Sequence, residues 1–227
     1  MIKKIINKTN YELVNKIIVN LMLNMKINQG HARCIATGLK YINEKEDFDY
    51  VIPMDGDGED RPEEILQFIE NINTSNNKPI VGERVKRSES LLFQICYKIH
   101  KLITLVFTGH TIKYGNFTCL PKDTVEKMTK EKATWNSFSG ALKKIEKDLI
   151  KVPSVRGSRY FGPSKMSFKN LITHSLSIIS VFRKTVLFRS ALFIVFYILL
   201  IKSNASIITL IPFVLLLIMI YSISSLS

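Results

Sequence analysis

The chain has 227 residues, enough for one domain of ordinary size with an appendage, and it carries a net charge of +13. This charge indicates an anionic partner, such as nucleic acid, anionic lipid or a phosphate-rich substrate. A nucleic-acid binder is the poorest choice, because the basic residues lack interleaved aromatic residues and a recognisable reading element. The three cysteines are far apart without metal-ligand spacing, which favours free thiols in a reduced compartment.

Strand and helix patterns alternate along the first half of the chain. We expect, in chain order, a helix running into an apolar strand (10–23), a helix after a glycine turn (28–42), a strand (49–54), a helix from Pro62, a strand (78–85) and a long amphipathic helix (88–107). This alternation predicts an α/β domain with a mostly parallel sheet. In such sheets, ligands bind at the carboxyl ends of the strands.

The end of the chain differs in composition from the rest. All 19 acidic residues precede residue 150, and Lys202 is the only charged residue after Arg189. Residues 206–221 are almost uninterrupted hydrocarbon, close to the ~20 residues that cross a bilayer as a helix, and residues 190–201 form a shorter apolar segment. Extended backwards, the shorter segment passes Arg189, which would have to snorkel to the interface. The two segments predict a transmembrane hairpin; a buried hairpin of core helices and a re-entrant first segment are the alternatives.

Charge predicts the orientation of this hairpin. An even number of crossings leaves both flanks on one side, and the basic domain with Arg183, Lys184 and Arg189 predicts that this side is the cytoplasm. Residues 166–184 are expected to lie along the membrane surface, or else to pack on the domain as a helix. We therefore expect an integral membrane protein with three parts: a partial α/β domain over 1–165, a juxtamembrane amphipathic segment over 166–185 and two transmembrane helices over 186–222.

Four acidic residues stand within six positions after the 49–54 strand: Asp55, Asp57, Glu59 and Asp60. Close carboxylates repel each other, and the cost falls when a cation or hydrogen-bond donors lie between them. A calcium EF-hand loop is excluded, because counting from Asp55 its sixth and twelfth positions need Gly and Glu but hold Asp60 and Leu66. On the D-x-D pattern alone, a solvated acidic turn without a ligand is the more common case.

The surroundings of this loop resemble a known family. The segments "NQGHARCIATGLKYI" and "DYVIPMDGDGEDRPEEI" are followed in order by "VGERVKRSES", "YGNFTCLPKDTVEKM" and "VPSVRGSRYFGPSKMS". Together they are similar to the polyprenyl-phosphate sugar transferases, the dolichol-phosphate-mannose-synthase-like branch of glycosyltransferase family 2, which has a GT-A fold. That family's core reads roughly Asp-Ala-Asp-Leu-Gln-Asp-Pro-Pro-Glu, and the chain matches it at Asp55, Asp57, Asp60, Pro62 and Glu63.

The resemblance implies a membrane-anchored, metal-dependent, inverting transferase that moves a sugar from a nucleotide-diphosphate sugar to a polyprenyl phosphate. The diphosphate leaving group gains charge as its bond to the sugar breaks, and Mg²⁺ or Mn²⁺ held by carboxylates stabilises that charge. We expect Asp57 as the direct metal ligand, helped by Glu59 in the motif's Gln position. Asp55 is expected on the nucleoside side of the donor or in the metal shell, and Asp60 facing the acceptor.

A polyprenyl phosphate is already an anion, so orientation and charge neutralisation should supply most of the catalysis. Guanidinium groups suit this task because they bind phosphate oxygens in bidentate fashion. The resemblance assigns it to two basic clusters: Arg84 and Arg87, and Arg156, Arg159 and Lys165. For any one arginine, the alternative is a solvated surface charge.

The turn "NQGH" falls where the family turns beside the nucleotide. The resemblance therefore places Asn28 and Gly30 at the donor, with His31 beside them or capping a helix. Residues 115–117 are expected to shape the acceptor mouth.

The chain also departs from the family. It lacks the Pro-x-Tyr-Asn-Glu-like and Asp-Asp-Gly-Ser motifs that end the family's first two strands and hold the donor's base and ribose. A sheet without those strands should leave edge backbone groups unpaired. The alternative function is therefore a catalytically inactive, truncated remnant that binds anionic lipid or a partner through its basic face. A family 2 transferase with a glycan acceptor is a third choice. The sequence leaves open the sugar, the base, the polyprenol length and the oligomeric state, a homo-oligomer included.

Overall fold

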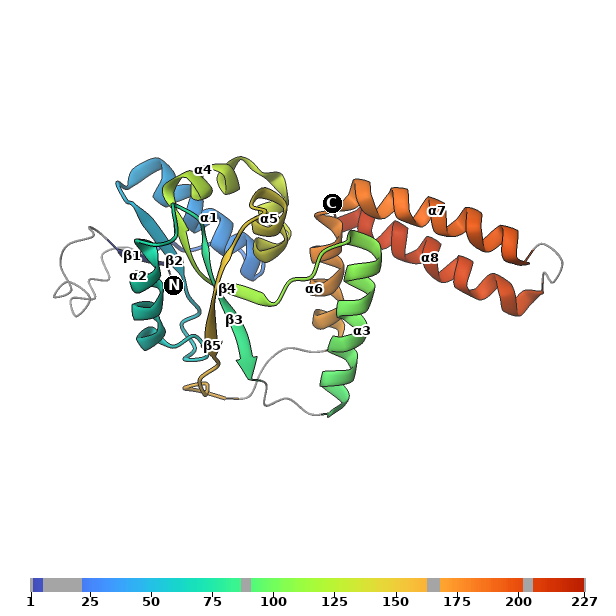
Figure 1. Ribbon diagram of the computed structural model, residues 1–227, viewed down its shortest axis with the longest axis horizontal. Coiled ribbons are helices and arrows are strands. Elements are labelled where there is room, and N and C mark those ends of the chain that lie inside the picture. Colours follow the sequence, from blue (N-terminus) through green and yellow to red (C-terminus); the bar gives the residue numbers. More distant parts are fainter. Residues whose placement is uncertain (1, 6–21, 87–90, 163–167, 202–205, 227) are drawn as a thin grey trace. The chain divides into compact units, whose positions relative to one another are not determined.

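The computed structural model describes residues 2–5, 22–86, 91–162, 168–201 and 206–226 (Figure 1). The chain divides into two compact units. The sheet unit comprises Met1–Ser88 and Lys113–Ser164, and the helical unit comprises Glu89–Ile112 and Lys165–Ser227. The helical unit thus includes a segment from the middle of the chain, an association that the sequence did not predict.

Within the residues described, the sheet has five strands in the order β1-β2-β4-β3-β5 (Figure 1). Their bounds are β1 Ile2–Ile5, β2 Tyr50–Pro53, β3 Ile80–Lys86, β4 Tyr114–Pro121 and β5 Ile150–Val155. Of the four pairings in this part of the chain, only β3–β5 is parallel. The α/β class is confirmed, but the expected mostly parallel sheet is wrong, because β4 inserts antiparallel between β2 and β3.

β2, β3 and β5 nevertheless point in the same direction. β4 runs antiparallel to both β2 and β3, and β5 runs parallel to β3. The carboxyl ends of β2, β3 and β5 and the amino end of β4 therefore meet at one edge of the sheet, which we call the carboxyl edge. Loops that follow these strands bring their side chains together there.

The edge of β2 that faces away from β4 is covered by β1. The two strands pair antiparallel from Ile2 opposite Pro53 to Ile5 opposite Tyr50. The first residues of the chain therefore supply a partner for this edge of β2, and β1 is the edge strand at this end of the sheet. The helix and strand expected over 10–23 fall mostly outside the described residues.

Two helices of the sheet unit were expected from the sequence, and two more, α4 and α5, were not. Among the described residues these are α1 (His31–Lys45), α2 (Ile65–Ile72), α4 (Lys122–Lys130) and α5 (Phe138–Ile145), with 3₁₀ turns η2 (Pro62–Glu64) and η3 (Lys132–Trp135). The helix expected after the glycine turn is confirmed as α1. The helix expected from Pro62 is confirmed as η2 and α2, with Pro62 in the first turn, where its missing N–H costs nothing.

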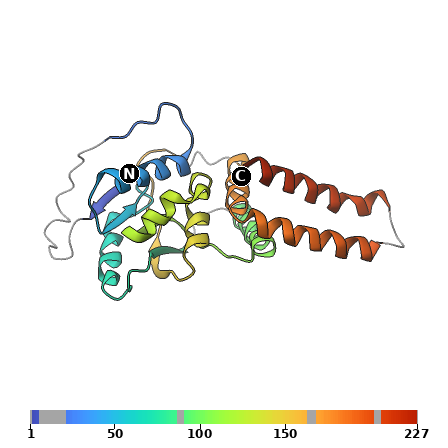
Figure 2. The same cartoon turned by 90° about the horizontal axis from the view of Figure 1, so that it is seen from above.

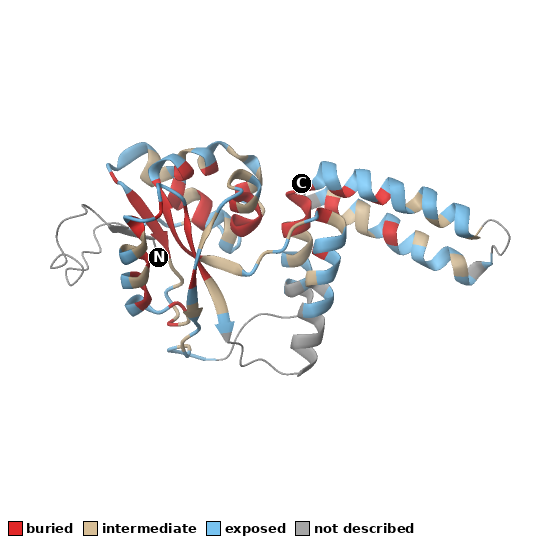
Figure 3. Ribbon diagram, viewed as in Figure 1, coloured by how far each residue is buried: buried red, intermediate tan, exposed pale blue. Residues whose placement is uncertain are grey.

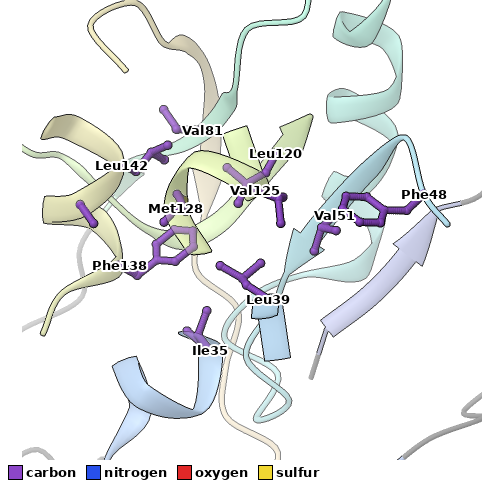
Figure 4. Packing of buried hydrophobic residues seen from close by; sticks show 11 residues of the cluster. Ile35, Leu39, Phe48, Val51, Val81, Leu120, Val125, Met128, Phe138 and Leu142 are labelled. Carbon is purple, nitrogen blue, oxygen red and sulfur yellow. The ribbon is translucent and has the colours of Figure 1, made fainter. Parts of the chain in front are cut away.

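Alternate residues of the strands pack into two hydrophobic cores, one on each face of the sheet. Val51 of β2 packs with side chains of α1, α4 and α5 (Figure 4). Its neighbour Ile52 packs with side chains of α2 on the other face. All four residues of β2 are buried, which explains why this strand is a short apolar run without polar alternation.

The helical unit contains α3 (Leu91–Thr108), α6 (Phe168–Ser180), α7 (Arg183–Ile201) and α8 (Ile207–Leu226). The long helix expected over 88–107 is confirmed as α3. Helices α7 and α8, which lie side by side (Figure 2), are long and apolar enough to span a membrane. Only 11% of each candidate span is buried, which argues against the hairpin of buried core helices (Figure 3).

Candidate functional site

The loop after β2, residues 55–60, is called the acidic loop here. Asp60 is buried, and its Oδ2 accepts a hydrogen bond from the Asp55 backbone N–H at 2.9 Å. Asp57 Oδ1 accepts one from the Glu59 N–H at 3.1 Å. Two of the four carboxylates therefore satisfy backbone donors of their own loop and fix its shape.

The segment after β5, residues 156–160, is called the arginine segment and lies against the acidic loop. The Gly157 N–H donates to the Glu59 carbonyl and the Tyr160 N–H donates to the Asp57 carbonyl, both at 2.9 Å. Only glycine fits at position 157, because a Cβ there would lie 2.5 Å from the Gly58 carbonyl oxygen. Backbone contacts thus join two segments that the sequence analysis identified separately.

The two arginines of this segment pair with carboxylates of the acidic loop. Arg159 Nε donates to Glu59 Oε1 at 3.0 Å, and its Nη2 lies 3.3 Å from Asp57 Oδ2. Arg156 Nη2 lies 2.6 Å from Glu59 Oε2, an ion pair without hydrogen-bond geometry. The hydrogen bond with Glu59 raises the pKa of Arg159 above its usual value. The Glu59 side chain is only 14% exposed, so its charge depends on these two partners.

Asp55 has a different partner, the first residue of α1. His31 Nε2 lies 2.9 Å from Asp55 Oδ1, and Asn116 Nδ2 lies 3.0 Å from the same ring nitrogen. The hydrogen bond with His31 lowers the pKa of Asp55. Burial instead raises the pKa of Asp60, although that carboxylate accepts the bond from the Asp55 N–H. Desolvation raises the pKa of both carboxyls, but the hydrogen bond with His31 outweighs it for Asp55, whereas desolvation is the largest cause for Asp60.

Arg84, near the end of β3, reaches the same edge. A Cβ on Gly115, at the start of β4, would lie 2.8 Å from Arg84 Nη2, so the guanidinium lies over a residue without a side chain. After the hydrogen bond with His31, the charges of Arg156 and Arg84 also lower the pKa of Asp55. Arg84 therefore belongs to the same electrostatic cluster as the arginine segment.

The remaining expected site residues either precede His31 in the chain or lie outside the described residues. Asn28 Oδ1 accepts a hydrogen bond from the Gly30 N–H at 3.0 Å, so these two residues shape the turn before α1. Arg87 and Lys165 lie outside the described residues. The expected contacts of Asn28 and Gly30 with a nucleotide, and of Asp60 with an acceptor, stay predictions.

No group of three or more His, Cys, Asp or Glu side chains among the described residues could hold a metal ion. The reason is visible in the contacts, since Asp57 and Glu59 face arginines and Asp55 faces His31. Mg²⁺, however, is commonly held by one or two carboxylates together with substrate phosphates. Asp57 is 36% exposed and is a residue of that chemical type, and the expected metal ligation by Asp55, Asp57 and Glu59 stays a prediction.

Two residues that the sequence analysis did not single out support the site. Glu64 is buried, and its Oε1 accepts a hydrogen bond at 2.9 Å from the N–H of Val155, the last residue of β5 before the arginine segment. The Tyr160 ring lies over Gly58, where φ is +91° and a Cβ would lie 2.8 Å from the ring. Nothing in the sequence marked Glu64 as a site residue, because the helix dipole already explains an acidic residue in the first turn of a helix.

The described fold and site define an α/β protein with a mixed sheet, a carboxylate–arginine cluster at the carboxyl edge and two C-terminal helices of membrane-spanning length. No protein family, curated protein or solved structure matches the chain.

Proposed function

We propose that this chain is a membrane-anchored glycosyltransferase with a GT-A domain, which moves a sugar from a nucleotide-diphosphate sugar to a polyprenyl phosphate with Mg²⁺ or Mn²⁺, and with inversion. The observation that carries the proposal is the contact between the acidic loop and the arginine segment, 100 positions apart at Glu59 and Arg159. A metal–diphosphate leaving group and a phosphate acceptor need carboxylates and guanidinium groups in one place. That is the combination found at the carboxyl edge.

The ion pairs between the arginine segment and the acidic loop suggest how the site is used. Arg156 and Arg159 neutralise Glu59 and Asp57. An incoming diphosphate competes for the guanidinium groups, because phosphate oxygens are strong bidentate acceptors. Asp57 would then be the carboxylate that holds the metal ion. When bound, the ion stabilises the charge that grows on the leaving diphosphate.

Arg84 is the side chain best placed to orient the acceptor. It lies at the same edge, at the end of β3, while the arginine segment follows β5. An anionic acceptor needs a cation that holds its phosphate in line with the sugar, rather than a strong general base. Arg84 therefore acts on the acceptor phosphate and the arginine segment on the donor diphosphate.

The helical unit supports the membrane part of the proposal. α7 and α8 are mostly exposed and have the length of membrane spans. A polyprenyl acceptor resides in the bilayer, so a tethered enzyme meets it at the membrane surface. Arg183, Lys184 and Arg189 near the start of α7 favour the cytoplasmic side for that end of the helix.

One observation favours a second candidate. Asp55, Asp57 and Glu59 each have a protein partner, so the cluster is stable as a purely structural set of ion pairs. A catalytically inactive protein that binds anionic lipid or a partner through its basic face would keep this arrangement. That candidate predicts salt-sensitive vesicle binding without metal and no metal-dependent nucleotide binding.

The test is sugar transfer in membranes that contain the full chain. Polyprenyl phosphate, Mn²⁺ or Mg²⁺ and a labelled panel of UDP- and GDP-sugars are supplied, and label is measured in the lipid phase. We expect metal-dependent transfer that falls about 10²–10³-fold in Asp57→Asn. Asp47→Asn is the matched control, because the Asp47 side chain is fully exposed and outside the site. Both variants should remain in the membrane fraction.

Transfer that survives Asp57→Asn would show that the metal assignment is wrong. No transfer with any donor, from protein shown to be folded and membrane-bound, would favour the inactive second candidate.

A further inference from the structure

Glu64 is a buried carboxylate that the proposed function does not use. It ends the 3₁₀ turn η2, directly before α2, and its side chain is only 8% exposed. Ile65 and Phe68, the next buried residues of the chain, pack into the hydrophobic core on one face of the sheet. Glu64 therefore stands on a closely packed element with a fixed position. A glutamate is almost never buried to this degree unless it is paired.

The partner of Glu64 is the end of β5. Glu64 Oε1 accepts a hydrogen bond from the Val155 N–H at 2.9 Å, across 91 positions of the chain. The pairing of β5 with β3 is irregular at this point, because the register shifts between Arg84 and Lys86 of β3. Such a shift disrupts the ladder locally and changes the direction of a strand. Glu64 thus supplies an acceptor where the sheet itself becomes irregular.

The bond from Val155 continues into the arginine segment. Further along, the Gly157 N–H and the Tyr160 N–H donate to backbone carbonyls of the acidic loop. The bond from Val155 differs from these two, because its acceptor is a carboxylate. A hydrogen bond to an ionised acceptor is roughly twice as strong as one between neutral groups. Glu64 therefore fixes the point from which the arginine segment starts.

The rest of the Glu64 carboxylate is poorly compensated. Arg61 Nη1 lies 3.9 Å from Glu64 Oε1, at the limit of an ion pair, and the Arg61 side chain is 44% exposed. Glu64 Oε2 is buried and has no hydrogen-bond partner in the part of the chain that the structure describes. A buried polar atom without a partner lowers the stability of the folded state. Stability alone therefore does not account for a glutamate at this position.

We propose that Glu64 is a positioning residue, which holds the start of the arginine segment so that Arg156 and Arg159 present their guanidinium groups to the donor diphosphate. Glu64 acts through the two arginines and does not touch the donor. Bidentate binding of phosphate oxygens depends on the place and angle of each guanidinium plane, so a displacement of about 1 Å weakens it strongly. The inference rests on the proposed function in one respect, that the arginine segment binds the diphosphate.

The test measures the binding of inorganic pyrophosphate to the full chain in detergent, by isothermal titration calorimetry without metal ions. Glu64→Ala removes the acceptor, and Glu64→Gln keeps an amide oxygen in its place. Glu70→Ala on α2 is the matched control, because Glu70 is exposed and the same charge is removed. Trp135 fluorescence and urea unfolding report whether the sheet unit of each variant is folded.

We expect pyrophosphate binding to weaken about tenfold in Glu64→Ala, about twofold to threefold in Glu64→Gln, and not at all in Glu70→Ala. The direction of the change is informative, because loss of a negative charge near arginines should by itself tighten the binding of an anion. Unchanged or tighter binding in folded Glu64→Ala overturns the proposal, even where the variant is less stable. If Glu64→Ala does not fold, unchanged or tighter binding in Glu64→Gln overturns it.

A second background tests whether Glu64 acts through the arginines. In a chain with Arg156→Lys and Arg159→Lys, the charges remain but the planar fork is lost, because lysine binds phosphate as a point charge on a flexible stem. Glu64→Ala should then weaken pyrophosphate binding by less than about twofold. An undiminished loss overturns the proposal, because Glu64 then acts on another part of the site.

The unchanged chain separates this proposal from the proposed function. If it binds no pyrophosphate, both the diphosphate site of the proposed function and the role of Glu64 are wrong. Binding to the unchanged chain that does not depend on Glu64 removes the role of Glu64 and leaves the diphosphate site standing.

Discussion

The sheet unit and the helical unit distribute apolar side chains in opposite ways. In the sheet unit, the largest buried side chains are aliphatic or aromatic, such as Phe68 and Leu39, and a cluster of carboxylates and arginines lies at the carboxyl edge. In the helical unit, α3, α7 and α8 expose aliphatic residues, while Thr104, Thr108 and Ser190 are buried. The hydrophobic effect sorts residues in this way when one unit folds against water and the other against hydrocarbon. The contrast between the two units is therefore what the proposed membrane attachment of the helical unit predicts.

The largest expected effect comes from two phenylalanines in these opposite settings. Phe68 is fully buried and packs on Phe117, with ring centroids 4.8 Å apart. Phe68→Ala should lower the free energy of unfolding of the sheet unit by about 3–5 kcal/mol. Phe196→Ala, at a position 62% exposed on α7, should change that quantity by less than about 0.5 kcal/mol.

The measurement is urea unfolding in detergent, followed by Trp135, which is the chain's only tryptophan and belongs to the sheet unit. Similar losses in the two variants would contradict the separation into units with different surroundings.

A second pair of variants tests whether the arginine segment is held against the acidic loop. Gly157→Ala places a Cβ 2.5 Å from the Gly58 carbonyl oxygen and must push the two segments apart. We expect a loss of about 1–3 kcal/mol in the free energy of unfolding and a loss of sugar transfer. Gly56→Ala is the matched control, because its Cβ meets no atom within 4 Å, and it should stay within about 0.5 kcal/mol of the unchanged chain. Equal behaviour of the two variants would mean that the segments do not touch.

The smallest expected effect concerns His31 and the pH dependence of stability. Asp55 has a folded-state pKa below its ordinary value of 3.8, chiefly because of the hydrogen bond with His31. Its contribution to stability is therefore present above the unfolded-state pKa and is lost as the pH falls through the folded-state pKa. His31→Ala should raise the folded-state pKa of Asp55 and reduce this contribution by at most about 1 kcal/mol at neutral pH, because the His31 side chain is half exposed.

An NMR titration of the Asp55 carboxyl checks this, with Arg33→Ala on the same helix as the control. An Asp55 pKa that is unchanged in His31→Ala would contradict the pairing.

Helices α1 and α2 were predictable because the spacing of apolar residues and the position of a proline can be recognised within a short segment of the sequence. Ile35, Ala36 and Leu39 stand at helical spacing and are the buried face of α1, and Pro62 starts the next helical segment. Strand directions were not predictable in this way. The insertion of β4 between β2 and β3 depends on contacts between distant segments, which periodicity does not record. The same limit applies to α3, whose pattern predicts an apolar face but not the medium that the face meets.

The residue types of the candidate site were predictable, and their pairing was not. The spacing of Asp55 and Asp57 identified the acidic loop, and the motif around Arg159 identified the arginine segment. That Arg159 reaches Glu59 depends on the shared direction of β2 and β5, which brings the loops after both strands to the carboxyl edge. The sequence analysis treated these charges as a metal site and a phosphate site, whereas the structure shows them neutralising each other.

The central claim is that the acidic loop and the arginine segment form one site that takes a divalent ion together with a diphosphate. The most direct test is Mn²⁺ binding to the full chain in detergent, followed by the EPR signal of free Mn²⁺, with and without UDP or GDP. We predict weak binding of Mn²⁺ alone, because Asp57 and Glu59 are paired with arginines, and about tenfold tighter binding with nucleotide. This gain should vanish in Asp57→Asn. Mn²⁺ binding that is unaffected by nucleotide, or by Asp57→Asn, would contradict the claim.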